Sequence, residues 1–292
     1  MKIEMSRQSN IGTRMKGYEQ IVQARLIRRM PVVIRLDGRN FHTFTQGMKK
    51  PFDDILIKSM QDTMKYLCKN IQGCVLGYTQ SDEITLILVD YKELNSSAWF
   101  DNKIQKICSV SASMATMAFN KFFWNNVQEK DNHFCFQEMR NEETVAYLTA
   151  LCKAREKGAM FDSRCFNIPK EEVTNLIYWR QLDATRNSIQ MVGQANFSHN
   201  ELQGKSCNEI QDMLFTQKGI NWNDLPTTYK RGSCCVKNTY PHKGFVQFIY
   251  GKCLEDCTIR DPKQPEKAWI IDNEIPIFTG EGREYIDILV DV

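Results

Sequence analysis

Val32-Val33-Ile34-Arg35-Leu36-Asp37-Gly38 is the stretch of sequence that decides the fold. Its β-branched and apolar residues predict a buried strand, and Gly38 ends that strand where the backbone turns sharply. The preceding residues 14–29 carry apolar side chains near one face and predict a basic amphipathic helix. Pro31 ends that helix, so the chain enters the strand directly from a positively charged segment.

Hydrophobic periodicity places the next helices and strands. Apolar residues at steps of three and four predict helices, and apolar runs beside turn residues predict strands. The polar Gln80-Ser81-Asp82 joins two such runs and indicates a hairpin, whose second strand is apolar on both faces and therefore central. In chain order we expect a helix over 53–71, strands over 73–79 and 83–90, a helix over 97–124 and a strand over 164–168.

The order strand, helix, strand, strand, helix, strand indicates an α+β protein. It is the βαββαβ order of ferredoxin-like antiparallel sheets with helices on one face, which polymerase palms and nucleotidyl cyclases share. We expect residues 1–170 to form a palm-like catalytic domain with the basic N-terminal helix. Residues 171–292 would form a C-terminal region of helices and a strand that packs on the palm, with helices over 170–191 and 207–217 and a strand over 232–238.

Composition excludes several classes of protein. The chain of 292 residues is 42% hydrophobic and 25% charged, which rules out low-complexity disorder and collagen-like repetition. The net charge of +3 is far below that of a histone-like binder, but residues 1–30 hold seven basic and only two acidic residues. No apolar run resembles a signal peptide or a membrane span, and the eleven irregularly spaced cysteines are typical of reduced thiols. We therefore expect a cytoplasmic protein without a membrane partner.

Carboxylates at strand ends carry the chemistry. Asp37 ends the first strand, while Asp82 and Glu83 stand at the start of the second hairpin strand. In a βαββ sheet these strands are neighbours, so the acids converge on one edge. Converging carboxylates cannot all stay ionised without a cation, and hard oxygen ligands suit Mg²⁺. The alternative is that Asp37 and Asp82 are only turn residues.

Basic and glycine residues nearby suit phosphate groups. Gly38-Arg39-Asn40-Phe41-His42 offers successive backbone N–H groups after a glycine, as a phosphate-wrapping nest does. Lys50 follows closely, and Lys103 and Lys106 lie three apart on the predicted long helix. These lysines can hold a triphosphate, or they can simply be solvated.

Six motifs in order resemble the tRNA(His) guanylyltransferase superfamily. The resemblance covers most of the chain, and the ordered set is far more specific than any one motif. The motifs are Arg14 to Glu19, Leu36 to His42, Gln80 to Glu83, Phe161 to Arg164, Trp179 to Gln181 with Asp183, and Leu225-Pro226 through Gly232.

The resemblance implies a reverse polymerase with a palm-like fold. Members of this superfamily add nucleotides to the 5′ end of tRNA with two Mg²⁺ ions and with ATP and GTP as substrates. ATP first adenylylates a monophosphate end, and the 3′ hydroxyl of a nucleoside triphosphate then attacks the activated phosphate. Members of the superfamily are often tetramers, so the resemblance also implies a homo-oligomer.

The resemblance also assigns residues position by position. Asp37, Asp82 and Glu83 would be catalytic, and Asp37, Asp82 and the Gly38 carbonyl would hold metal. The nucleotide would contact Asp37, Gly38, Arg39, Asn40, Phe41, His42, Lys50, Asp53, Ser81, Asp82, Lys103 and Lys106. RNA would contact Asn187 and, in the basic segment, Arg14, Arg25, Arg28 and Arg29.

One motif departs from the histidine-tRNA-specific enzymes. They carry His-Ile-Asn-Asn-Leu-Tyr-Asn where residues 185–191 read Thr-Arg-Asn-Ser-Ile-Gln-Met, with only Asn187 matching. The chain is therefore more similar to the bacterial and archaeal Thg1-like proteins, which resemble template-directed repair enzymes for tRNA 5′ ends. Residues 134–160 match nothing in the superfamily pattern.

Two other functions fit the same residues. A palm-fold nucleotidyl cyclase would use the same acids on a nucleoside triphosphate alone, although the chain has no Gly-Gly-Asp-Glu-Phe hairpin. A catalytically silent RNA-binding protein would keep the basic segment without needing Asp37 and Asp82. Incubation with nucleotide and no RNA separates the first alternative, and RNA retention without pyrophosphate release would support the second.

Overall fold

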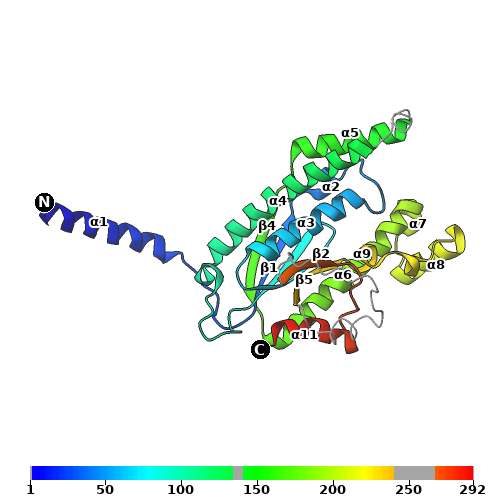
Figure 1. Cartoon of the computed structure of the whole chain (residues 1–292). Helices are drawn as coiled ribbons and strands as arrows, with labels where there is room; N and C mark the ends of the chain where they lie inside the picture. Colours follow the sequence, from blue (N-terminus) through cyan, green and yellow to red (C-terminus); the bar gives the residue numbers. More distant parts are fainter. Residues whose placement is uncertain (1, 134–140, 240–266, 292) are drawn as a thin grey trace, which may run out of the picture.

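The computed structural model describes residues 2–133, 141–239 and 267–291 (Figure 1). The N-terminal half of the described chain contains α1 (Lys2–Ile21), β1 (Val32–Gly38), α2 (Phe41–Phe44), α3 (Asp54–Asn70), β2 (Cys74–Gln80), β3 (Glu83–Leu88), η1 (Trp99–Asn102), α4 (Ile104–His133), α5 (Glu142–Lys157) and β4 (Phe161–Asn167). The C-terminal part contains η3 (Lys170–Glu172), α6 (Val173–Asn196), α7 (His199–Leu202), α8 (Cys207–Lys218), η4 (Trp222–Asp224), α9 (Thr227–Arg231), β5 (Ser233–Thr239), β6 (Lys267–Asp272), η5 (Gly280–Arg283) and α11 (Glu284–Val290).

The strands form one six-stranded antiparallel sheet in the order β4-β1-β3-β2-β5-β6. β1 lies between β4 and β3, with Val32 opposite Leu88 and Asp37 opposite Glu83. The predicted order of four strands and two helices is confirmed as β1-α3-β2-β3-α4-β4, with the short helix α2 and the helix α5 as additions. β3 is a central strand, as its two apolar faces predict.

One face of the sheet is covered by α3 and α4. Ile34 and Leu36 of β1 and Leu86 of β3 are buried in a core that includes Met64 of α3 and Phe119 of α4. Residues two apart along a strand face the same side, so the apolar stripe runs the whole length of β1. This layer forms the larger of the hydrophobic cores.

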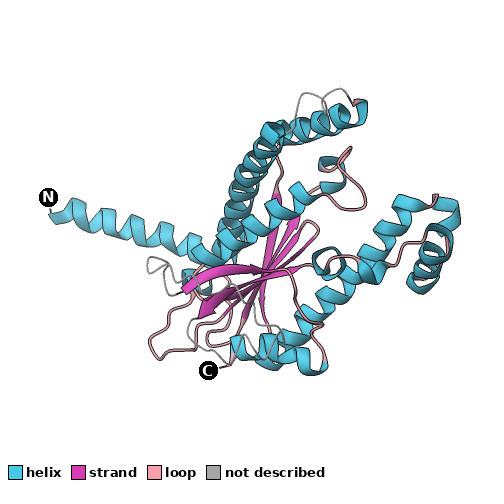
Figure 2. Cartoon of the chain, turned by 45° about the vertical axis from the view of Figure 1, so that its right-hand side comes forward, coloured by secondary structure: helices cyan, strands magenta, loops and turns pink. Residues whose placement is uncertain are grey.

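The opposite face is covered as well, which corrects the expectation of helices on one face. Val33 of β1 and Ile87 of β3 pack with Val173 and Ile177 of α6 and with Ile286 of α11. Figure 2 shows helices on both sides of the strands. A sheet with apolar residues on both faces needs a second cover, and the C-terminal region supplies it. This region also adds β5 and β6 to the same sheet.

The predicted helix over 14–29 is wrong in its second half. α1 ends at Ile21, and the chain around Ala24 is extended because it pairs with the segment before α4. The N–H of Leu26 donates to the carbonyl of Asn102 (2.9 Å), and the N–H of Ile104 donates to that of Ala24 (3.1 Å). These contacts with a distant segment outweigh the local helical preference. α1 itself extends away from the rest of the chain (Figure 1).

The boundaries of α4 and β4 also differ from the sequence prediction. Phe100 and Asp101 have left-handed backbone angles, so α4 begins only at Ile104 and runs to His133. The stretch 125–160, which showed no period, holds the end of α4 and all of α5. Among the described helices, none combines the length and apolar character that crossing a bilayer requires.

Candidate active site

Three carboxylates lie in one row across the end of the sheet. Asp37 of β1 pairs with Glu83 on one neighbouring strand and with Asp162 on the other. Directly paired residues in an antiparallel sheet project from the same face, so the three side chains share the face that α6 covers. This row is where the sequence analysis expected acids to converge, and Asp162 is an addition to it.

Asp82 joins this row from the hairpin between β2 and β3. The N–H of Gly38 donates to the carbonyl of Asp82 (3.1 Å), which ties the end of β1 to the hairpin. Ser81, in a left-handed conformation at φ 54°, donates from Oγ to Oδ1 of Asp82 (3.0 Å). Burial raises the pKa of Asp82 to about 6; the Ser81 hydrogen bond opposes the rise, and the charges of Asp37 and Glu83 add to it. The structure therefore brings Asp37, Asp82 and Glu83 together.

Arginines facing these acids were missed as site residues. Arg164 of β4 lies 3.8 Å from Asp37 and 3.4 Å from Asp162. Glu83 is held from two sides, by Arg35 of β1 at 3.5 Å and by a closer ion pair with the buried Arg180 of α6. Strand alternation could have indicated them. Residues 35 and 37 of β1 stand two apart, as do 162 and 164 of β4, so each arginine projects from the same face as its neighbouring acid.

The donor set of the site fits Mg²⁺. Within the described ranges, no group of three or more His, Cys, Asp or Glu side chains is arranged to hold a metal by itself. Mg²⁺ does not require one, since it binds through one or two carboxylates together with substrate phosphates and water. Burial is the main cause of the raised pKa of Asp82 and the charge of Asp37 adds to it, so a cation at this position would favour the ionised carboxylates. Asp37, Asp82 and the Gly38 carbonyl are the oxygen donors that would hold it.

The loop after Asp37 is partly used by the fold itself. The N–H groups of Gly38 and Arg39 already donate, to the carbonyls of Asp82 and Met160 (2.8 Å for Arg39). Asn40 is left-handed at φ 56° and starts α2. Phe41 is buried, and its ring packs edge-on against Phe119 and Phe161 at 5.5 and 5.3 Å between centroids.

These positions limit what the loop can offer to a phosphate. Because the ring of Phe41 belongs to the core, only its backbone can face a ligand. The side chains of Arg39, Asn40 and His42 are exposed beside the carboxylates, as is Ser81.

Asp53 has a structural role that the sequence analysis did not foresee. Its buried carboxylate caps α3 by accepting from the N–H groups of Ile55 and Leu56, both at 3.0 Å. It also accepts from the N–H of Lys49 (3.2 Å) and from the hydroxyl of Tyr147 in α5 (2.9 Å). Four hydrogen bonds account for this residue without a nucleotide, so we leave it out of the proposed contacts. Lys50, in contrast, is exposed.

Lys103 and Lys106 lie away from the carboxylates, toward the other end of the sheet. The carbonyl of Ile104, beside Lys103, accepts from the thiol of Cys165 (3.9 Å), which pairs with Ile34. Three residues along β1 separate Ile34 from Asp37, a distance of about 10 Å. The ammonium of Lys106 lies over the ring of Phe100, 4.9 Å from its centroid. The structure does not bring these lysines to the carboxylates within one chain.

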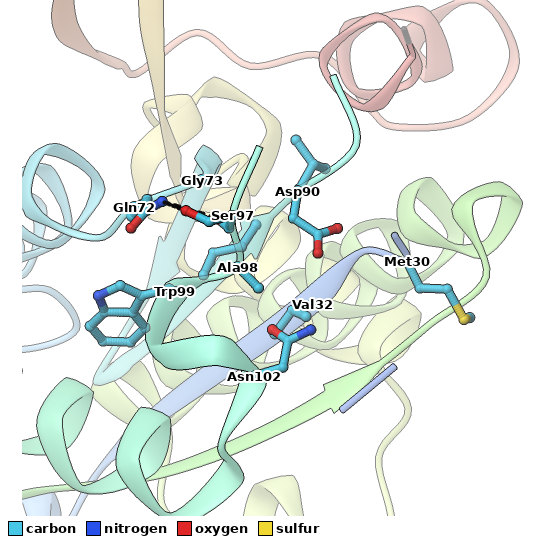
Figure 3. A pocket seen from close by; sticks show the side chains of 11 residues that line it. Met30, Val32, Gln72, Gly73, Asp90, Ser97, Ala98, Trp99 and Asn102 are labelled. Atoms are coloured by element: carbon cyan, nitrogen blue, oxygen red, sulfur yellow. Dashed lines mark hydrogen bonds between the residues drawn. The ribbon is translucent and has the colours of Figure 1, made fainter. Parts of the chain in front are cut away.

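The basic segment before β1 is at that far end too. Arg25 and Arg28 both pair with Asp101, and the N–H of Arg29 donates to Asp90 (2.9 Å). Arg14 lies on the exposed α1. A cavity of about 10 Å³, room for one water, sits nearby and is lined by Val32, Gly73, Asp90, Trp99 and Asn102 among others (Figure 3). It is distant from the carboxylate row and plays no part in the candidate site.

The Trp-Arg-Gln motif of α6 divides its residues between two tasks. Gln181 is buried and ties α6 to the C-terminal segment, donating to the carbonyl of Pro276 (2.8 Å) and accepting from the N–H of Phe278 (3.0 Å). Arg180 faces the carboxylate row and also pairs with Asp183 at 3.3 Å. Asn187 follows Asp183 by four residues, so it lies on the same helix face, further along.

Comparison with known proteins identifies the family of the chain. The family description tRNAHis guanylyltransferase matches residues 12–169, and the description of the Thg1 C-terminal domain matches residues 171–269. The chain belongs to the tRNAHis guanylyltransferase family. It is therefore a transferase of the nucleotidyltransferase class, in a family that acts in tRNA processing.

Solved and curated relatives support the family assignment. A bacterial tRNA(His) guanylyltransferase (Thg1)-like protein in complex with ATP is 39% identical with a TM-score of 0.74, covering 96% of this chain and 99% of that one. The corresponding complex with GTP is 37% identical with a TM-score of 0.71, covering 97% and 100%. A probable tRNA(His) guanylyltransferase of Dictyostelium discoideum is 28% identical, covering 73% of this chain and 77% of the relative. The mixed α/β architecture of this guanylyltransferase family member thus matches solved members.

Proposed function

We propose that this protein is a template-directed 3′-to-5′ nucleotidyltransferase that rebuilds the 5′ ends of tRNA. The observation that carries the proposal is that Asp37 and Asp82, two carboxylates from distant parts of the chain, lie together at one end of the sheet. Two solved relatives are described in complex with ATP and with GTP, which supports nucleoside triphosphates as substrates here.

In the proposed reaction, the 3′ hydroxyl oxygen of a nucleoside triphosphate forms a bond to the 5′ phosphorus of the RNA. The bond from that phosphorus to pyrophosphate breaks when the RNA end is a triphosphate. A monophosphate end first reacts with ATP, releasing pyrophosphate, and AMP then leaves. Two Mg²⁺ ions, when bound, would lower the pKa of the attacking hydroxyl and neutralise charge on the leaving group. Asp37, Asp82 and the Gly38 carbonyl would hold these ions.

The remaining residues of the site would position the metal ligands and the triphosphate and would neutralise charge. Glu83 is paired with Arg35 and Arg180, so its charge is already balanced and we assign it a positioning role beside the metal ligands. Arg164 pairs with both Asp37 and Asp162, so it would keep the closer partner, Asp162, when Asp37 binds a metal ion. The backbone after Arg39 and the side chains of Ser81 and Lys50 would contact the triphosphate.

Repair of 5′ ends is favoured over addition of guanosine to tRNA(His). Asn187 is the one residue of 185–191 that matches the histidine-tRNA-specific motif, and it lies on the face of α6 that carries Arg180. A site with most of that motif replaced would select nucleotides by pairing with the opposing base. We place Asn187 at the RNA, whereas Arg25 and Arg28 would have to exchange Asp101 for phosphate.

The deciding experiment uses tRNAs shortened at the 5′ end that carry mono- or triphosphate termini. We expect addition of the nucleotide complementary to the opposing base, an ATP requirement only for the monophosphate, and no product opposite an unpaired position. Equal incorporation of all four nucleotides would contradict templating. A cyclic nucleotide formed without RNA would replace the proposal with cyclase activity. The same protein sample in light scattering would test the expected tetramer.

A further inference from the structure

An exposed tryptophan with an arginine against it stands on the surface formed by α4 and α5. Trp124 of α4 keeps 45% of its surface exposed, and the guanidinium of Arg155 in α5 lies 4.2 Å from the ring centroid. Lys121 and Met117 precede Trp124 by three and seven residues, so all three share one face of α4. Met117 is 54% exposed and Lys121 is exposed as well. We call these four residues the α4–α5 surface.

The charge of this surface is not balanced by acids. Neither Arg155 nor Lys121 forms an ion pair within the described chain, whereas Arg25 and Arg28 before β1 pair with Asp101, and Arg35 and Arg180 pair with Glu83. The Nε of Arg155 is buried and has no hydrogen-bond partner among the described residues. A large aromatic ring left in solvent beside uncompensated cations is the combination that single-stranded nucleic acids use, because bases stack on the ring and phosphates pair with the cations.

Hydrogen bonds connect the α4–α5 surface to the loop that follows Asp37. Asn120 donates from Nδ2 to the carbonyl of Ala159 (2.9 Å) and accepts from its N–H (2.8 Å), which fixes the end of the α5–β4 connection against α4. The next carbonyl, of Met160, accepts from the N–H of Arg39 beside Asp37 (2.8 Å). From Asn120 to Trp124 the helix rises about 6 Å. An RNA strand that leaves the carboxylates toward Trp124 would pass the exposed side chains of Arg39 and Met160.

We propose that the α4–α5 surface binds RNA, with an unpaired base stacked on Trp124 and a neighbouring phosphate held by Lys121. Arg155 fixes the ring and supplies positive charge. The inference deepens the proposed function, on which it rests, by giving a task to α5, for which the sequence offered none. Figures 1 and 2 show α5 lying alongside the C-terminal half of α4, where it can support such a surface.

The test measures RNA binding without nucleotide, so that it does not depend on catalysis. The full-length protein is titrated into a fluorescein-labelled tRNA lacking its first 5′ nucleotide, and anisotropy gives Kd at several salt concentrations. We expect Trp124→Ala to weaken binding about tenfold and Trp124→Phe by less than about threefold, since phenylalanine still stacks. Lys121→Gln should lower the slope of log K against log salt by about one.

A matched control and two further outcomes make the test decisive. Phe215→Ala removes a ring from α8 that is more exposed (63%) than that of Trp124, and it should leave Kd unchanged. Wild-type affinity in folded Trp124→Ala overturns the inference, even if the protein extends tRNA and the proposed function stands. Affinity unchanged but oligomeric state altered would show that the surface joins copies of this chain, which also overturns it. Trp124-dependent binding without any nucleotide addition would retain the inference and remove the proposed function.

Discussion

The two faces of the sheet use the same strands for different purposes. On the face under α3 and α4, β1 contributes Val32, Ile34 and Leu36, which are all buried and apolar from one end to the other. On the face under α6, the same strand changes from the apolar Val33 to Arg35 and Asp37. The face under α3 and α4 belongs to the hydrophobic core along its whole length. The face under α6 belongs to the core at one end and carries the charged residues of the candidate site at the other.

This difference explains how a small set of charges is tolerated at the end of a sheet that is otherwise core. Continuous burial on one face fixes the register, because a shift of one residue would turn Arg35 and Asp37 into that core. The charged residues then need only their own ion pairs and the exposed sheet edge. The predictions below test whether the two faces separate into stability and activity.

The largest effect is expected from the charged face. Asp37→Ala and Asp82→Ala should each abolish nucleotide addition, a loss of about a thousandfold or more, because each removes a proposed metal ligand. Single-turnover assays with a 5′-shortened tRNA measure the loss. Circular dichroism melting should show a folded protein, since both side chains are at the sheet edge. Full activity in either variant would remove the metal assignment.

A truncation on the apolar face should show the reverse pattern. Leu86→Ala, at a fully buried position of β3, should lower the free energy of unfolding by about 2–5 kcal/mol. Urea denaturation measures this, and rates per folded molecule at low temperature should stay close to wild type. Activity lost while stability is unchanged would contradict the division between the faces.

The stability of the metal-free protein should depend on pH through Asp82. Its folded pKa of about 6 lies above the usual 3.8 of an aspartate, so the folded state becomes less stable as the pH rises through this interval. Asp82→Asn should therefore stabilise the protein by roughly 2 kcal/mol at pH 8 and by nothing near pH 3.5. Urea titrations in EDTA at the two pH values give the difference. Asp212→Asn, on the exposed side of α8, controls for the loss of one charge, and an equal gain there would count against the idea.

The smallest effect is expected far from the carboxylates. Lys103→Ala and Lys106→Ala should change the rate of nucleotide addition by less than about twofold if each chain works alone. Their position beside Ile34, and not beside Asp37, is the reason. Steady-state kinetics with varied triphosphate concentration would test this. A large rise in KM would mean that these lysines reach a triphosphate bound in another copy.

Local patterns predicted the elements that carry their own signal. β1, α3 and the hairpin followed from apolar runs and spacing, and the convergence of Asp37 with Asp82 and Glu83 followed from strand order. The pairing of Glu83 with Arg180 did not, because it joins residues from β3 and α6 that no local rule connects. The family resemblance named candidate site residues, but it did not show where their side chains lie in the structure.

The misplaced residues show why. The spacing of Lys103 and Lys106 placed them on one helix face, but spacing does not determine which end of the sheet that face lies against. The early end of α1 likewise depends on the hydrogen bond between Leu26 and Asn102. The sequence around Asp53 is compatible with a helix cap and with a nucleotide contact. The hydrogen bond from the hydroxyl of Tyr147 in α5 favours the cap.

The pairing of β2 with β5 has a consequence for how this protein can be divided. β5 begins at Ser233, beyond the predicted boundary at residue 170, yet it hydrogen-bonds along β2 through Leu76 to Thr79. A fragment ending at 170 would present β2 as a bare edge and leave Val33 and Ile87 in water. We expect copies of such a fragment to pair through this edge and to precipitate. The catalytic half therefore cannot be separated from the C-terminal region as an independent folding unit.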